Sequence, residues 1–168
     1  MWSDDLVDEA NQTRAAVERA LGALDVDGEL VLTGGASVTG ALTKGDIDLH
    51  LRVAPGTFPQ SIARLRRVYP VASPQSWAAT LAVFEVPAAR PTGLAVTPVG
   101  SEHDRRFCLT WQAIRRDPAL LARYNVLKSE TVGTDEYEHR KSAFFSAIVS
   151  ASGHGGGTAG PRPGDGAG

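Results

Sequence analysis

The sequence predicts an α+β domain built on a small mixed sheet. Short apolar runs that alternate or end in glycine lie between residues 30 and 99, whereas apolar residues recur at helical spacing before residue 25 and after residue 102. The chain has 168 residues, 42% of them hydrophobic, which is enough for one core. We therefore expect a single domain over residues 1–150. A Gly- and Pro-rich tail over residues 151–168 follows, whose composition predicts disorder.

The N-terminal part of the chain is predicted to contain one helix and two strands. Apolar residues one helical turn apart indicate a helix over residues 3–24. A short strand over residues 30–32 stops at a glycine pair. Strict alternation indicates a second strand over residues 46–53, with the apolar side chains on one face. The opposite face carries Asp46, Asp48, His50 and Arg52.

The rest of the chain is predicted to add a helix, a hairpin and three further helices. The helix covers residues 58–68, and strands over residues 80–86 and 93–99 form the hairpin. The three C-terminal helices follow from apolar residues at helical spacing after residue 102. Asp117 is expected to cap the second of them and Thr134 the third.

Charge and cysteine content limit the possible functions. The formal net charge of −2 and a pI near 6.1 give no general attraction for nucleic acids or anionic membranes. Because Cys108 is the single cysteine, we expect neither an intramolecular disulfide framework nor any cysteine-based metal site. The acidic N-terminus has no signal-peptide pattern, and no apolar run approaches membrane-spanning length. We therefore expect a soluble, cytoplasmic protein.

Two aspartates and a glycine pair are the residues with the clearest chemical potential. Asp46 and Asp48 project from the same face of a strand, and paired carboxylates attract hard cations such as Mg²⁺. A strand that ends in Gly-Gly lets backbone N–H groups approach a phosphate. The alternative is an ordinary solvated strand face, on which His50 and Arg52 are salt-bridge partners of the aspartates. His50 itself could join the metal site or hydrogen-bond to Asp48.

This pattern resembles a known signature. Gly-Gly followed after about ten residues by Asp-Ile-Asp-Leu resembles the DNA polymerase beta-like nucleotidyltransferase superfamily. The longer run over residues 34–48 is similar to the motif G-S-T-A-V-P-G-L-x-x-K-x-x-I-D of the GrpB-type family, and a second segment resembles that family's helical tail. The resemblance spans roughly residues 30–150. The matching residues are Gly34, Val38, Gly40, Lys44 and Asp48, and then Pro118, Leu121, Tyr124, Leu127, Lys128, Tyr137 and Lys141.

The resemblance implies a nucleotidyltransferase-like fold and Mg²⁺-dependent transfer of a nucleotidyl group from a nucleoside triphosphate to an unknown acceptor. It implies that Asp46 and Asp48 hold the metal. Glu85 is the best candidate for the superfamily's third carboxylate, although solvent exposure explains its position equally well. The expected nucleotide-binding residues are Gly34, Gly35, Ser37, Lys44, Tyr124, Lys128 and Lys141. The two tyrosines near these lysines, Tyr124 and Tyr137, could instead pack in the core.

Asp46 is an addition to the family pattern, which usually has one acid near the end of this run; it moves the chain toward the two-acid superfamily pattern and would strengthen metal binding. The sequence lacks features of the family at three further places. Gly35 replaces a residue that is often serine, so that Ser37 or Thr33 would have to supply the hydroxyl. Gly93 and Ala95 stand where the family has histidines, and residues 110–112 replace a Phe-Arg-Asp run. These missing features favour a second hypothesis, a non-catalytic nucleotide- or partner-binding module on the same fold. A third hypothesis is a metal-dependent phosphate-ester hydrolase that shares only the acid pair.

Overall fold

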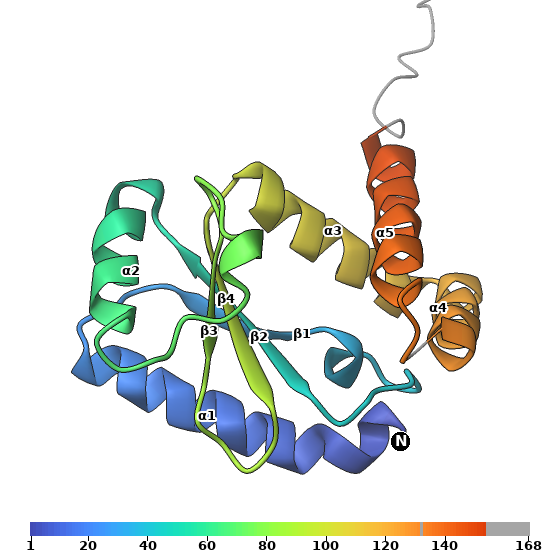
Figure 1. Cartoon of the computed structure of the whole chain (residues 1–168), viewed down its shortest axis with the longest axis horizontal. Coiled ribbons are helices and arrows are strands. Elements are labelled where there is room, and N and C mark those ends of the chain that lie inside the picture. Colours follow the sequence, from blue (N-terminus) through green and yellow to red (C-terminus); the bar gives the residue numbers. More distant parts are fainter. Residues whose placement is uncertain (132, 154–168) are drawn as a thin grey trace, which may run out of the picture.

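The computed structural model describes residues 1–131 and 133–153, which form a four-stranded mixed sheet flanked by helices (Figure 1). The described part confirms the predicted α+β class. Its helices are α1 (Val7–Ala23), α2 (Phe58–Leu65), α3 (Glu102–Arg116), α4 (Pro118–Thr131) and α5 (Tyr137–Gly153). Its strands are β1 (Glu29–Thr33), β2 (Ile47–Val53), β3 (Ala82–Glu85) and β4 (Thr92–Pro98). Short 3-10 helices are η1 (Ser3–Leu6), η2 (Gly35–Ser37), η3 (Pro55–Thr57) and η4 (Pro74–Ser76).

The strand order β1-β2-β4-β3 places β2 in the interior of the sheet. β2 pairs antiparallel with β1 and parallel with β4, and β3 pairs antiparallel with β4, as the predicted hairpin requires. In this register Asp48 lies opposite Thr33 on one side and Gly93 on the other. The strand that carries Asp48 is therefore held by hydrogen bonds along both edges.

One face of the sheet packs on α1 and α2 and forms the main core. The predicted alternation of β2 is confirmed, because its four apolar side chains at odd positions are at most 1% exposed. Burial of this face removes apolar surface from water and supplies the main stabilisation of the domain. The core comprises Ala10, Val17, Leu21, Val26, Leu30, Ile47, Leu49, Leu51, Val53, Leu65, Ala82, Phe84, Val86, Leu94 and Val96.

The opposite face of the sheet is also covered. α3 packs against β4 and against α4 and α5, so that the three C-terminal helices lie together on the side away from α1 and α2 (Figure 1). Val38 and Ala41, from the segment between β1 and β2, join Trp111, Ile114, Tyr124 and Ile148 in a second core. His50, on the polar face of β2, is only 1% exposed. That face is consequently enclosed where it meets α3.

Some element boundaries differ from the sequence prediction. α2 ends at Leu65, and Val68 beyond it is 47% exposed. The Thr134 hydroxyl, predicted to cap α5, donates instead to the Thr131 carbonyl at the end of α4 (2.7 Å). α5 continues to Gly153, past the predicted domain boundary at residue 150, and residues 154–168 of the predicted tail lie outside the described part. Among the described residues, no helix combines the length and apolar character that crossing a membrane requires.

Candidate functional site

The two predicted metal-binding aspartates lie at the start of β2. Asp46 immediately precedes the strand and accepts a hydrogen bond from the Thr43 hydroxyl (3.3 Å). Asp48 is half-buried within the strand. Burial, reinforced by the negative charge of Asp46, raises the pKa of Asp48 to about 6. The two carboxyl groups therefore interact electrostatically, as their spacing predicts.

Gly34 brings the chain directly against Asp48. Its φ of 68° lies in the region that favours glycine. A Cβ atom at this position would lie only 2.0 Å from Oδ2 of Asp48. The first glycine of the predicted pair is thus required both by backbone conformation and by the space that the carboxylate occupies.

The space beside Gly35 is filled from α4, which gives a physical reason for the missing hydroxyl. A Cβ atom at residue 35 would lie 3.0 Å from the Tyr124 hydroxyl, 3.0 Å from the Leu42 carbonyl oxygen and 3.5 Å from Nζ of Lys128. Tyr124 therefore supplies a hydroxyl next to the turn. The Ser37 hydroxyl has other partners, because it donates to the Gly34 carbonyl (2.8 Å) and accepts from Nη2 of Arg115 (2.8 Å).

All three lysines of the chain converge on the aspartates. The sequence contains only Lys44, Lys128 and Lys141, against 14 arginines. The positive charge of each lysine lowers the pKa of Asp48 and so opposes the effect of burial and Asp46. These are the three lysines that the sequence analysis names as expected nucleotide-binding residues.

The lysines are held among tyrosine rings. Lys128 is 6% exposed, and its ammonium group donates to the Tyr124 hydroxyl (3.3 Å). Burial lowers the pKa of Lys128 and raises that of Tyr124. Nζ of Lys44 lies 4.7 Å and Nζ of Lys141 lies 5.3 Å from the centre of the Tyr137 ring. Both tyrosines are buried, as the core alternative predicted, and they also position the lysines.

Glu85 lies at the end of β3 and is exposed. It is opposite Gly93 of β4, which in turn is opposite Asp48 of β2, so the two acids share one face of the sheet. Two strand spacings, about 10 Å, separate their backbones. The role of Glu85 as a third carboxylate stays a prediction, because the strand register alone does not bring its side chain to the aspartate pair.

A cavity of about 200 Å³ adjoins Asp48 on this face. The small residues Gly93 and Ala95 form its floor on β4, because they leave the sheet surface uncovered next to the aspartate. Trp111 and Phe145 line it from α3 and α5, and Lys141 lies at the same cavity. The same cavity is therefore lined by residues 93, 95 and 111, three positions at which this chain departs from the family pattern.

The polar residues further along β2 do not pair with the aspartates. A ring nitrogen of His50 hydrogen-bonds with the Thr97 hydroxyl (2.7 Å), and Arg52 forms ion pairs with Asp104 (2.7 Å) and Glu29 (2.6 Å). The expected hydrogen bond of His50 to Asp48 and the salt bridges of Arg52 to the aspartates are therefore wrong. Burial lowers the pKa of His50 to about 4. These contacts join residues far apart in sequence, which periodicity cannot reveal.

Two further residues near the site were not predicted. Arg115 on α3 donates to the carbonyls of Leu32 (3.3 Å) and Ser37 (3.2 Å), in addition to the Ser37 hydroxyl. Asn125 on α4 bonds the Gly40 carbonyl (2.9 Å) and the Leu42 amide (2.8 Å). Both side chains therefore fix the segment between β1 and β2 that contains the glycine pair.

Comparison with known proteins places this geometry in context. The crystal structure of the conserved protein GrpB from Enterococcus faecalis matches with a TM-score of 0.66 and 15% sequence identity, covering 85% of this chain and 92% of that one. At this identity the match shows the fold alone. None of the curated proteins matches the chain. The GrpB protein family profile matches residues 2–151, and the chain therefore belongs to the GrpB family, within the nucleotidyltransferase-like superfamily.

Proposed function

We propose that the protein binds a nucleoside triphosphate with Mg²⁺ at the start of β2 and transfers its nucleotidyl group to an acceptor that remains to be identified. The single observation that carries this proposal is the convergence of two aspartates and all three lysines beside the Gly34 turn. Two carboxylates and three ammonium groups give this cluster a net charge of about +1 before any metal binds, which favours an anionic ligand.

The donor set fits Mg²⁺. Asp46 and Asp48 offer the hard carboxylate oxygens that this ion prefers, and their mutual repulsion is relieved by a cation. These two residues would hold the metal. When bound, Mg²⁺ would supply neutralisation of charge on the phosphate groups.

The lysines are the proposed phosphate ligands. Lys128 is buried beside Gly35 and bonded to a tyrosine hydroxyl, so an anionic ligand would stabilise its charged form. Lys44 and Lys141 lie near the Tyr137 ring and would bind further phosphate oxygens. Gly34 leaves the backbone free of a side chain at the turn, where a phosphate group could approach closely.

The cavity beside Asp48 supports an acceptor site next to the phosphates. It adjoins the aspartate and is lined largely by apolar and aromatic residues, with Lys141 as its cation. α3 and α5 would shield an acceptor bound in this cavity from bulk water. Asp48 would then lie between the nucleotide and the acceptor, which is the position that transfer of a nucleotidyl group requires.

A non-catalytic nucleotide-binding module is the second candidate. The observation that favours it is the register of β3, β4 and β2, in which Gly93 rather than an acid stands directly opposite Asp48, and Glu85 is one strand further away. Binding without turnover would need only the lysines and the glycine turn. The hydrolase hypothesis differs in releasing inorganic phosphate rather than pyrophosphate.

Calorimetric titration with a nonhydrolysable ATP analogue, with and without Mg²⁺, tests the binding step. We expect Lys128→Met to weaken binding under both conditions, and Asp48→Asn to remove the enhancement by Mg²⁺. Arg67→Met, at an exposed residue after α2, is the matched control and should bind like the wild type. Binding that none of these substitutions alters would refute the assignment of the site.

Turnover separates the two candidates. Incubation of the protein with each nucleoside triphosphate, Mg²⁺ and a panel of hydroxyl-bearing acceptors should release pyrophosphate in the wild type and not in Asp48→Asn. Nucleotide binding without pyrophosphate release would favour the non-catalytic module, and Asp48-dependent release of inorganic phosphate would favour the hydrolase.

A further inference from the structure

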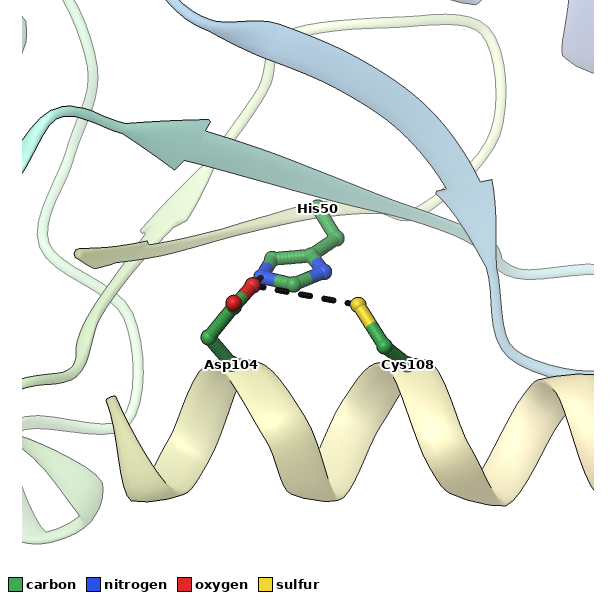
Figure 2. A group of neighbouring side chains, drawn as sticks. All are labelled: His50, Asp104 and Cys108. Carbon is green, nitrogen blue, oxygen red and sulfur yellow. Dashed lines mark hydrogen bonds and ion pairs between the residues drawn. The ribbon is translucent and has the colours of Figure 1, made fainter. Parts of the chain in front are cut away.

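A second group of potential ligands lies further along β2, beneath α3. His50 projects from β2, and Asp104 and Cys108 project toward it from successive turns of α3 (Figure 2). Nε2 of His50, which also hydrogen-bonds with the Thr97 hydroxyl (2.7 Å), is 3.8 Å from Oδ1 of Asp104. The Cys108 sulfur is likewise 3.8 Å from that oxygen. One ligand atom from each residue lies within 4.8 Å of the other two.

We propose that His50, Asp104 and Cys108 bind a divalent transition-metal ion of the zinc class, at a site separate from the aspartate pair. Imidazole nitrogen, carboxylate oxygen and thiolate sulfur are the three donor types that Zn²⁺ binds in proteins. Metal–ligand distances of about 2.0–2.3 Å in a tetrahedron place ligand atoms roughly 3.3–3.6 Å apart. The two separations of 3.8 Å need to contract by only a few tenths of an ångström, and the His50–Cys108 separation, at most 4.8 Å, by no more than about 1.3 Å, for which both side chains would have to move.

The charge around the cluster accommodates a dication. Asp104 and Glu29 are both paired with the single guanidinium of Arg52, which leaves one negative charge in excess. Binding would replace the thiol proton of Cys108 with a metal–sulfur bond, and the proton would pass to the buffer without any change of oxidation state. A dication with a thiolate adds one positive charge, so the cluster with Glu29 and Arg52 would be neutral, and the guanidinium of Arg115 on the pocket wall would favour an anion as a further ligand.

Oδ1 of Asp104 retains capacity for a metal. Its close bond is with Nε of Arg52 (2.7 Å), whereas the Thr97 hydroxyl at 3.5 Å and the Cys108 sulfur at 3.8 Å are long contacts. The other oxygen accepts from the Gly100 amide (2.8 Å) and from Arg52 (3.1 Å), which fixes the orientation of the carboxylate. Hydrogen bonds of this kind orient metal ligands in known sites.

Cys108 is the partly exposed member of the group, whereas His50 and Asp104 are only 1% and 2% exposed. A pocket of about 130 Å³ is lined by His50, Cys108 and Phe107, with Arg52 and Arg115 on its walls. It provides an entry path and room for a water molecule or a small anion as the fourth ligand. The three protein donors with one open position match the coordination of catalytic rather than structural zinc sites.

Cobalt absorption provides the test, because Cys108 is the only cysteine of the chain and any thiolate–cobalt band must come from it. The full chain, freed of metals by a chelator and kept reduced, is titrated with Co²⁺. We expect a thiolate-to-cobalt charge-transfer band that saturates at one ion per chain and disappears when Zn²⁺ is added. Competition with a chromophoric chelator then gives the affinity for Zn²⁺.

Substitutions decide which residues are ligands. Cys108→Ser, which preserves side-chain shape, should remove the band and weaken Zn²⁺ binding by at least tenfold, and His50→Gln and Asp104→Asn should weaken binding similarly, with folding checked by circular dichroism. Asp46→Asn is the matched control and should leave the band unchanged. The proposal is overturned if the wild type shows no band, if His50→Gln and Asp104→Asn bind like the wild type, or if the band saturates at one ion per two chains.

Discussion

Changing Asp48 to asparagine is expected to stabilise the fold at neutral pH. Burial and the neighbouring Asp46 raise the pKa of Asp48 from its ordinary value of 3.8 to about 6. A carboxyl group whose pKa is raised on folding contributes stability while it is protonated, and this contribution is lost as the pH rises through the folded-state pKa. The difference between the two pKa values corresponds to about 3 kcal/mol at pH values well above the folded-state pKa.

The asparagine variant avoids this cost because its side chain has a similar shape and no charge. At pH 7.5 its free energy of unfolding should exceed that of the wild type by up to about 3 kcal/mol, or roughly 6–12 °C in Tm for a domain of this size. At pH 4 the gain should fall below about 1 kcal/mol. Burial of His50 lowers its pKa to about 4. The contribution of His50 to stability therefore falls as the pH falls from 6.5 toward 4, equally in the wild type and in Asp48→Asn, and it cancels in the comparison.

Urea unfolding followed by circular dichroism measures the difference at both pH values. A chelator must be present, because a cation bound to ionised Asp48 would offset the cost of its charge. Asp27→Asn, at an exposed carboxylate, is the control and should change stability by no more than about 0.5 kcal/mol. If Asp48→Asn is no more stable than the wild type at pH 7.5, or gains equally at pH 4, the argument from burial is refuted.

Further substitutions, measured by urea unfolding, test the packing at the glycine turn and at the ion pair of Arg52 with Asp104. Gly34→Ala should cost at least about 2 kcal/mol because of its positive φ and the adjacent carboxylate, whereas Gly22→Ala, with open space around it, should stabilise α1 by up to about 1 kcal/mol. Gly35→Ser should cost about 1–3 kcal/mol, and Tyr124→Phe in the same chain should recover part of it; full additivity would contradict the contact. Asp104→Ala should cost about 2–4 kcal/mol by removing the buried partner of Arg52, which would keep only its ion pair with the exposed Glu29, and a change below about 1 kcal/mol would show that the buried pair is dispensable.

Local patterns in the sequence predicted much of the fold. The alternation over residues 46–53 predicted both the strand and the buried face, because side-chain period and burial are linked directly in a strand. Asp117 caps α4 as predicted, with its carboxylate accepting from the Ala119 amide (2.8 Å). The hairpin of β3 and β4 was likewise predicted from two apolar runs and a short connection.

Contacts between distant segments could not be predicted in the same way. Nothing in the local pattern of β2 indicates that β4 pairs with it in parallel, or that Arg52 binds Asp104 on α3. The role of Gly35 also depends on a distant element, since Tyr124 and Lys128 fill the adjacent space. Periodicity specifies which face of an element is buried, whereas the partner of that face is decided by packing of the whole chain.

The interior position of β2 has a consequence for the motions of the site. Hydrogen bonds to β1 and β4 hold both edges of the strand, and its apolar face is fully buried. Amide protons of residues 47–53 should therefore exchange with solvent chiefly through global unfolding, and remain protected on the timescale on which loops open. The carboxylate of Asp48 is thus carried by one of the most rigid parts of the molecule. We expect the side chains that adjust to a bound ligand to be those of Lys44, Lys128 and Lys141, because these residues lie outside the sheet.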